Sequence, residues 1–209
     1  MVKPKIKEIL SQYHKKRIDD GELIPAAVLV PLFYARGEYH LLFTQRNRGL
    51  GSHQGQVCFP GGVRQEGDAS LVDAALREAE EEIGLAREDI ELYGELDDAA
   101  TLTSGCRITP FVALIPHPYS FKINPREVEQ VFSIPLSALK DERYFRQGHP
   151  AAPLWAAKDE GNFDQEYPTA NGQPLPGYFY EYQGRVVWGA TAYIVRQLME
   201  LLQQQGLWS

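Results

Sequence analysis

The segment R-E-A-E-E-E-I-G-L, residues 77–85, sets the tightest limit on how this chain can fold, because it concentrates four glutamates on one short helix. At about 100° per residue, Glu78, Glu81 and Glu82 form one ridge along the edge of the buried stripe, and Glu80 points to solvent. The buried stripe consists of Val72, Ala75, Leu76, Ala79 and Ile83. Like charges one turn apart destabilise a helix by roughly 0.2–0.5 kcal/mol per pair, and a position beside the core adds a desolvation cost. Stability alone therefore does not explain the ridge.

A hard divalent cation does explain the ridge, because carboxylate oxygens one helical turn apart can share Mg²⁺ or Mn²⁺ and lose their repulsion. The competing interpretation is a solvated acidic face without a ligand. The preceding loop, F-P-G-G-V-R-Q-E-G-D at 59–68, favours the cation, because its adjacent glycines allow a close backbone approach and a carbonyl there can complete the ion's shell. A glycine loop before a cation-binding helix also suits an anionic phosphate ligand. The residues thus indicate metal-assisted phosphate chemistry.

Hydrophobic periodicity and turn residues predict the other elements. Helices are expected over 3–17, from Asp68 or Ser70 to a left-handed cap at Gly84, after 136 to Leu139, and over 190–205. Strands are expected within 24–46 with a turn at Arg36-Gly37, at 90–96, 106–116 and 127–136, and within 177–189 with a turn at Gln183-Gly184. Residues 49–67, 97–105 and 159–177 are expected to be loops. This order predicts an α/β (α+β) fold with a mixed sheet.

The chain length and charge narrow the class of protein further. A chain of 209 residues with 44% apolar residues suits a single domain over 1–209, with an N-terminal helical extension at about 3–19 and a long loop at about 159–177. The net charge of −7 argues against binding to nucleic acid or to an anionic membrane. The basic helix at the N-terminus fits either a membrane surface or packing on the domain, and we favour packing. Cys58 and Cys106 are expected to be free thiols in a cytoplasmic protein. The sequence does not decide whether the protein forms a homodimer.

The acidic helix and its preceding loop resemble the Nudix box, G-x5-E-x7-R-E-U-x-E-E-x-G-U, in which U is apolar. Gly62 and the run from Arg77 to Leu85 match, whereas Asp68 replaces the first glutamate and eight residues rather than seven separate it from Arg77. Upstream, L-L-F-T-Q-R-N-R-G-L-G-S-H-Q-G-Q-V-C-F-P-G-G at 41–62 resembles the signature of the coenzyme A pyrophosphatase-like branch of Nudix hydrolases. That branch also accepts the aspartate and the extra residue. Asn47 and Gly51 depart from its usual serine and arginine.

The resemblance implies a Nudix-type α/β/α sandwich around a central mixed sheet. It assigns metal ligation to Glu78, Glu82 and the carbonyl of Gly61, with Glu81 as a further ligand or as the base that activates water. Arg77 would orient these carboxylates, which agrees with their common ridge. The additional acid that the family takes from a later segment is expected at Glu127, or otherwise at Glu95. Near the proposed pocket, the candidates for binding substrate are Arg46, His53 and Gln56, each with a structural role as the alternative.

The implied activity is hydrolysis of a diphosphate linkage with Mg²⁺ or Mn²⁺ as cofactor. The first expectation for the substrate is coenzyme A or acyl-CoA, which would give 3′,5′-ADP and (acyl-)phosphopantetheine. Another nucleoside diphosphate derivative, such as ADP-ribose or a dinucleotide, is the alternative. A catalytically silent domain that binds a nucleotide and a structural acidic helix without any ligand also stay open.

Overall fold

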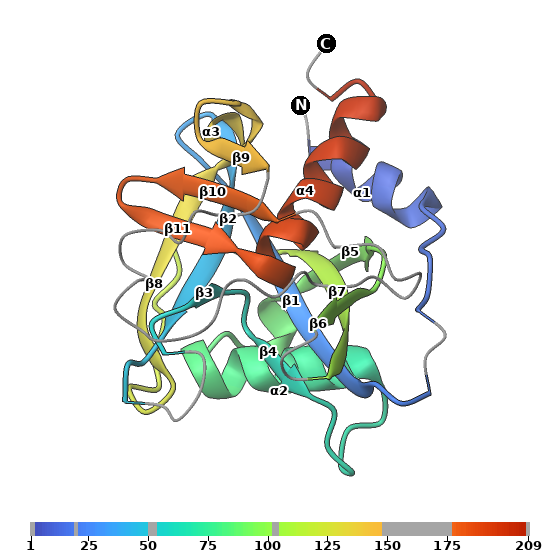
Figure 1. Ribbon diagram of the computed structural model, residues 1–209, viewed down its shortest axis with the longest axis vertical. Coiled ribbons are helices and arrows are strands. Elements are labelled where there is room, and N and C mark those ends of the chain that lie inside the picture. The colour runs from blue at the N-terminus through green and yellow to red at the C-terminus, as the bar shows by residue number, and fades with distance from the viewer. Residues whose placement is uncertain (1–2, 19–20, 50–53, 102–104, 148–176, 208–209) are drawn as a thin grey trace.

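A mixed sheet of eight strands forms the centre of the structure, a computed structural model that describes residues 3–18, 21–49, 54–101, 105–147 and 177–207 (Figure 1). Its strands are β1 (Ile24–Ala35), β2 (Glu38–Arg46), β3 (Val57–Cys58), β4 (Gly61–Val63), β5 (Glu91–Glu95), β6 (Ala99–Thr101), β7 (Cys106–Leu114) and β8 (Val128–Pro135). The main order is β3-β2-β1-β7-β5, and β4, β6 and β8 pair with β1, β7 and β2. Because β1 is parallel to β7 and antiparallel to β2, the predicted mixed sheet is confirmed.

Helices cover both faces of this sheet. The helix α2 (Leu71–Ile83) lies on one face, and α1 (Lys3–Gln12) and α4 (Gly189–Gln204) lie on the other (Figure 1). A second sheet, in the order β11-β10-β9, lies on the side of α4 and consists of β9 (Phe145–Gln147), β10 (Tyr178–Tyr182) and β11 (Arg185–Trp188). Two short helices, η1 (Arg87–Asp89) and α3 (Leu136–Lys140), complete the described elements. The layers confirm the predicted α/β/α sandwich.

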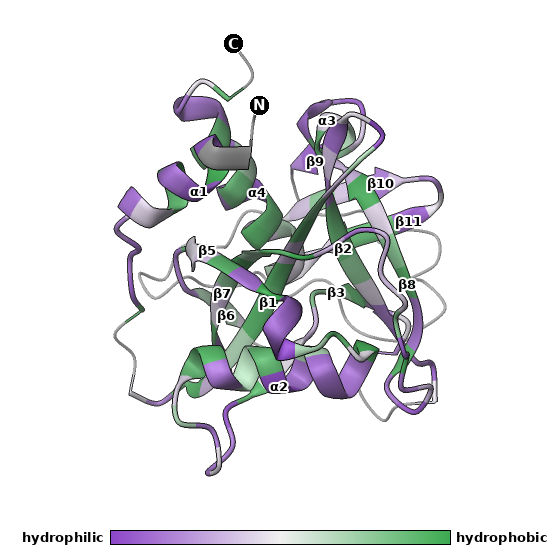
Figure 2. Cartoon of the chain, turned by 180° about the vertical axis from the view of Figure 1, so that it is seen from behind, coloured by the Kyte–Doolittle hydropathy of each residue, from purple (hydrophilic) through white to green (hydrophobic). Residues whose placement is uncertain are grey.

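The central strands supply apolar side chains to two cores, one on each face of the sheet. In β1, Ala27 and Leu29 pack toward α2, whereas Val30 and Leu32 belong to the core beneath α1 and α4. Successive side chains of a strand point to opposite faces, so a strand covered on both sides is apolar without interruption. Figure 2 shows this apolar character in β1. The sequence A-A-V-L-V at 26–30 therefore fixes β1 as an inner strand rather than an edge.

Both predicted hairpin turns are confirmed. Arg36 and Gly37 have φ values of +53° and +90°, and Gln183 and Gly184 have values of +51° and +74°. Two successive residues with positive φ give the tight turn whose twist matches that of antiparallel strands, and glycine adopts this conformation without steric cost. The turns set the register of β1 against β2 and of β10 against β11.

The N-terminal helix is shorter than predicted, since α1 ends at Gln12 rather than at residue 17. The following residues bind two neighbouring acids instead of continuing the helix: the backbone N–H of Lys16 donates to Asp97, and that of Ile18 donates to Asp98. Residues Ile6, Ile9 and Leu10 of α1 are buried. The helix thus packs on the domain, the interpretation that we favoured over a membrane surface.

Four short strands lie outside the predicted elements. The expected loop at 49–67 contains β3 and β4, the expected loop at 97–105 contains β6, and β9 was not predicted at all. These strands have only two or three residues each, too few for a period of two to be visible. They form because a longer neighbouring strand has backbone left to pair with, as residues 26–28 of β1 do for β4 and residues 106–108 of β7 do for β6. Of the loop predicted at 159–177, only residue 177 belongs to the described part of the chain.

Candidate functional site

The helix α2 begins and ends where its capping residues predict. The side chain of Ser70 accepts a hydrogen bond from the backbone N–H of Asp73 at 3.2 Å, and its hydroxyl donates to the Asp73 carboxylate at 2.6 Å. At the other end, Gly84 has a left-handed φ of +65° and donates to Glu80. Caps satisfy backbone groups that a helix end leaves without partners. They therefore fix which faces of the helix the four glutamates occupy.

The structure divides the predicted acidic ridge into an inner and an outer part. Glu82 is only 3% exposed and the side chain of Glu78 is 13% exposed, so both carboxylates face the sheet. The side chain of Glu81 is 53% exposed and turns toward solvent. Glu80 is exposed, as predicted. Two of the three ridge carboxylates therefore converge beneath the sheet, and Glu81 lies beside them.

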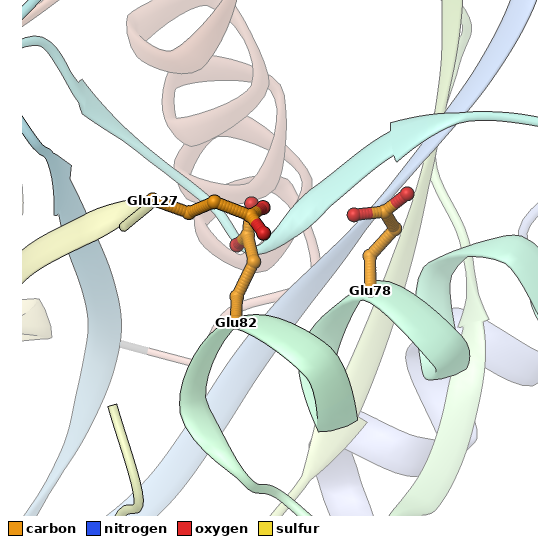
Figure 3. A group of neighbouring side chains, drawn as sticks. All are labelled: Glu78, Glu82 and Glu127. Atoms are coloured by element: carbon orange, nitrogen blue, oxygen red, sulfur yellow. The ribbon is translucent and has the colours of Figure 1, made fainter. Parts of the chain in front are cut away.

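A third carboxylate reaches this inner pair from another segment of the chain. One oxygen each of Glu78, Glu82 and Glu127 lies within 4.8 Å of the other two (Figure 3). Glu127 immediately precedes β8, and its side chain extends toward Glu82. The alternative acid, Glu95, instead forms an ion pair with Lys15. Of the two candidates from later segments, only Glu127 joins the cluster.

The charges of the inner carboxylates are only partly compensated within the described protein. Burial raises the pKa of Glu82 from 4.5 to about 8, and the neighbouring charges of Glu78 and Glu127 act in the same direction. Burial also raises the pKa of Glu78, although the hydrogen bond from Arg77 opposes this shift. Oε2 of Glu82 is buried and has no hydrogen-bond partner among the described residues. Buried charges are normally paired or bound to metal, so this set of oxygens fits a hard divalent cation.

Arg77 holds three of the surrounding acids in place. Its Nε and Nη2 donate to the two oxygens of Asp68 at 2.9 and 3.0 Å, which forms a bidentate pair. Its Nη1 donates to Glu78 at 2.7 Å and to Glu81 at 3.0 Å. The arginine lowers the pKa of Asp68 through these hydrogen bonds. Asp68, which replaces the glutamate of the box, therefore anchors the guanidinium that orients Glu78.

The adjacent glycines bring the backbone against both the sheet and the cluster. A Cβ atom on Gly61 would lie 2.3 Å from the carbonyl oxygen of Ala27 in β1. A Cβ atom on Gly62 would lie 2.6 Å from Oε1 of Glu78. A backbone hydrogen bond from Gly61 also lowers the pKa of Glu82 and partly offsets its burial. A side chain on Gly61 would clash with the backbone of β1, and one on Gly62 would displace the Glu78 carboxylate, so the close approach expected of these glycines is confirmed.

Two of the three predicted substrate-binding residues, Arg46 and Gln56, lie at the ends of β2 and β3. Arg46 ends β2, and its positive charge lowers the pKa of Glu82. Its Nε is buried without a hydrogen-bond partner in the described part of the protein. The backbone carbonyl of Gln56 accepts a hydrogen bond from the backbone N–H of Arg46 at 2.9 Å. His53 lies outside the described residues.

Asn124 belongs to the surroundings of the cluster but was not among the predicted residues. Its Nδ2 donates to Oε1 of Glu127 at 2.9 Å, and its backbone N–H donates to the carbonyl of Glu82 at the same distance. An asparagine followed by proline is a turn signal, and N-P-R-E at 124–127 contains it three residues before the acid. That pattern indicates a turn, but it does not identify the partner of the amide.

A cavity of about 570 Å³ lies at the other end of α2, between residues 15–18 and β7. Of the residues predicted for the metal site, only the alternative acid Glu95 lines this cavity. Much of its charged lining is paired within the protein, since Lys15 contacts Glu95 and Asp98, and Arg107 donates to the carbonyl of Ile18. The cavity is therefore separate from the carboxylate cluster.

None of the described helices is long and apolar enough to span a membrane.

Comparison with known proteins agrees with this geometry. Residues 23–154 match the family model described as NUDIX domain. A protein of Photorhabdus laumondii named "Uncharacterized Nudix hydrolase NudL" is 37% identical over 191 residues, which cover 90% of this chain and 89% of that protein. A protein of the same name from Citrobacter koseri is 38% identical over 174 residues, or 83% and 80% of the two chains. The crystal structure of a MutT/nudix family protein from Enterococcus faecalis has a TM-score of 0.54 at 15% identity, over 94% of this chain and 69% of that one.

Proposed function

This chain belongs to the NUDIX family and is a Nudix hydrolase, and we propose that it hydrolyses the diphosphate linkage of coenzyme A or acyl-CoA with Mg²⁺ or Mn²⁺ as cofactor. The observation that carries the metal-dependent part is the cluster of Glu78, Glu82 and Glu127, whose oxygens lie within 4.8 Å of one another. The buried Oε2 of Glu82, which lacks a partner in the described protein, supports a ligand at this position. Together these residues form an oxygen-only donor set of the kind that Mg²⁺ and Mn²⁺ prefer.

In this proposal Glu78, Glu82 and Glu127 hold the cation together with the backbone of Gly61. A bound cation would lower the pKa of a water molecule and offset the charge of the diphosphate oxygens. The residues of the chain then have separate tasks. Arg77 keeps Glu78 in its inward position through the 2.7 Å hydrogen bond.

Glu81 is our candidate for the general base. Its side chain is more than half exposed and lies outside the buried cluster, so its carboxylate is free to receive a proton from water. Its hydrogen bond to Arg77 keeps it on the same side of α2 as Glu78. The alternative role, a further metal ligand, requires the Glu81 side chain to turn inward.

Arg46 is our candidate for binding a phosphate of the substrate. Its guanidinium lies near Glu82 and has a buried Nε without a partner among the described residues. A guanidinium matches the oxygens of a phosphate group in charge and geometry. We propose His53 and Gln56 as further contacts to the substrate because both belong to the segment that follows Arg46 in the sequence.

The choice of coenzyme A rests on the sequence at 41–62 and is tested by a panel of substrates. The purified protein is incubated with Mg²⁺ or Mn²⁺ and coenzyme A, acetyl-CoA, ADP-ribose or a dinucleotide, and the products are identified by mass spectrometry. We expect 3′,5′-ADP from the first two compounds. Efficient cleavage of only ADP-ribose or the dinucleotide would replace coenzyme A by that substrate class.

The metal site is tested with Glu82→Gln, which we expect to lose turnover by orders of magnitude. The matched control is Glu80→Gln, because Glu80 is exposed on the same helix and lies outside the cluster. We expect this control to retain its turnover. Nucleotide binding without any product under either metal would instead indicate a catalytically silent domain. Full activity of a correctly folded Glu82→Gln protein would contradict the metal site.

A further inference from the structure

The C-terminal end of α2 is closed by a segment that also carries the third acid of the cluster. The last carbonyl groups of a helix have no partners within the helix and require donors from elsewhere. Here the backbone N–H of Lys122 donates to Ile83 and that of Asn124 donates to Glu82, both at 2.9 Å. A Cβ atom on Gly84 would lie 2.7 Å from Cβ of Lys122, so the two chain segments are in close contact. Glu127 follows three residues after Asn124 and therefore takes its position from this cap.

Asn124 uses each of its polar groups to connect the helix with Glu127. Its carbonyl oxygen accepts hydrogen bonds from the backbone N–H groups of Glu127 and Val128, at 3.1 and 2.9 Å. Its Oδ1 accepts one from the N–H of Arg126 at 3.1 Å. Its Nδ2 donates to Oε1 of Glu127 at 2.9 Å. The side-chain amide thus fixes one carboxylate oxygen, and the backbone N–H fixes the distance to Glu82.

We propose that Asn124 is the positioning residue for Glu127 and that it aligns this carboxylate with Glu78 and Glu82. The inference rests on the proposed function, because it assigns Glu127 to the cation. A glutamate side chain has several rotatable bonds, and a hydrogen bond to one oxygen restricts the orientation of the other. The amide is suited to this task because it donates without adding charge to an already acidic cluster. Groups that orient metal ligands typically contribute about 10- to 100-fold to metal affinity.

The direct test is Asn124→Asp, which keeps an oxygen for the N–H of Arg126 but removes the donor to Glu127. Titration of the metal-free protein with Mn²⁺ in a calorimeter should show affinity about 10- to 100-fold weaker than in the wild type. The matched control is Asn47→Ala, because Nδ2 of Asn47 donates to the carbonyl of Pro125 in the same segment without contacting the Glu127 carboxylate. We expect Asn47→Ala to bind Mn²⁺ as the wild type does. Unchanged or tighter binding by Asn124→Asp would overturn the proposal.

A double-mutant cycle separates positioning from general disruption. If Asn124 acts through Glu127, then Asn124→Asp should have no further effect on Mn²⁺ affinity in a protein that already carries Glu127→Gln. Losses that multiply in the double variant would show an independent structural effect and refute the inference. Thermal unfolding in EDTA verifies that each variant is folded before titration.

The same titration distinguishes failure of this inference from failure of the proposed function. If Glu82→Gln weakens Mn²⁺ binding but Glu127→Gln does not, Glu127 is not a ligand; the positioning role of Asn124 then fails while the metal site stands. If neither variant weakens binding, the cluster does not hold the cation, and the proposed metal-dependent function fails with it.

Discussion

Replacing Glu82 by glutamine should stabilise the metal-free protein, although it removes a proposed metal ligand. The carboxylate is 3% exposed and lies near Glu78 and Glu127, and its Oε2 has no hydrogen-bond partner among the described residues. Its pKa is raised from 4.5 to about 8, chiefly by burial. The charged form is therefore disfavoured in the folded state. An uncharged amide of similar shape avoids this cost.

The magnitude follows from the linkage between protonation and folding. One pKa unit corresponds to about 1.4 kcal/mol, so a raised pKa destabilises the folded protein increasingly as the pH rises from 4.5 to about 8. At pH 7 the loss is roughly 3 kcal/mol relative to pH 4.5. The buried amide of the variant retains an unpaired polar group, which costs about 1–3 kcal/mol. We therefore expect a net gain of up to about 2 kcal/mol in the free energy of unfolding of Glu82→Gln at pH 7.

The assay is urea denaturation in EDTA at pH 5 and pH 7, with Glu80→Gln as the exposed control. The gain of Glu82→Gln should be larger at pH 7, because the cost to the wild type grows with each pH unit between the ordinary pKa of 4.5 and the raised pKa of about 8. Addition of Mn²⁺ should stabilise the wild type but not the variant, since a ligand that binds only the folded state raises its stability. A Glu82→Gln protein less stable than the wild type in EDTA at pH 7, or a difference independent of pH, would refute the reasoning.

Three further perturbations test the surroundings of the cluster. In Gly62→Ala the new Cβ would lie 2.6 Å from Oε1 of Glu78, so calorimetry should show at least about tenfold weaker Mn²⁺ binding in a folded protein; unchanged affinity would show that the carboxylate has room to move. Glu81→Gln should reduce turnover by about 10²- to 10⁴-fold and leave Mn²⁺ affinity intact, because this side chain is 53% exposed; a parallel loss of affinity would make it a ligand instead. Asp68→Asn should remove part of the stability that the wild type has above about pH 4 and loses as the pH falls, because the pKa of Asp68 is lowered by Arg77; urea denaturation at pH 3 and pH 7 measures this difference, and equal losses at both values would contradict it.

The sequence predicts the parts of the site that depend on local structure. Helical periodicity places Glu78 and Glu82 on a ridge at the edge of the buried stripe and Glu80 in solvent, and the structure shows the first two facing the sheet and Glu80 exposed. The same periodicity places Glu81 on the ridge, but its side chain turns outward to Arg77. A side chain on the ridge can turn toward the core or toward solvent, and the hydrogen bond from Arg77 holds Glu81 on the solvent side.

The parts that were not predicted depend on contacts between distant segments. The strand β4 forms because Gly61–Val63 pair with β1. No periodicity of apolar residues within this short segment indicates that pairing. Glu127 was a candidate through family resemblance, whereas its proximity to Glu82 follows from the way residues 122–124 close the end of α2. Asn124 was missed for the same reason: its turn is visible in the sequence, but its partners are not.

The bidentate pair between Asp68 and Arg77 has a consequence for how this protein and its relatives are aligned. Aspartate is one methylene shorter than glutamate, and the stretch between it and the arginine is one residue longer than in the common pattern. The distances of 2.9 and 3.0 Å show that the shorter side chain still reaches Arg77 across the longer stretch. A sequence alignment counts Asp68 and the additional residue as two separate differences from the pattern, although both act on the same ion pair with Arg77. Chains that exchange only one of the two features would be the ones in which the arginine loses its anchor.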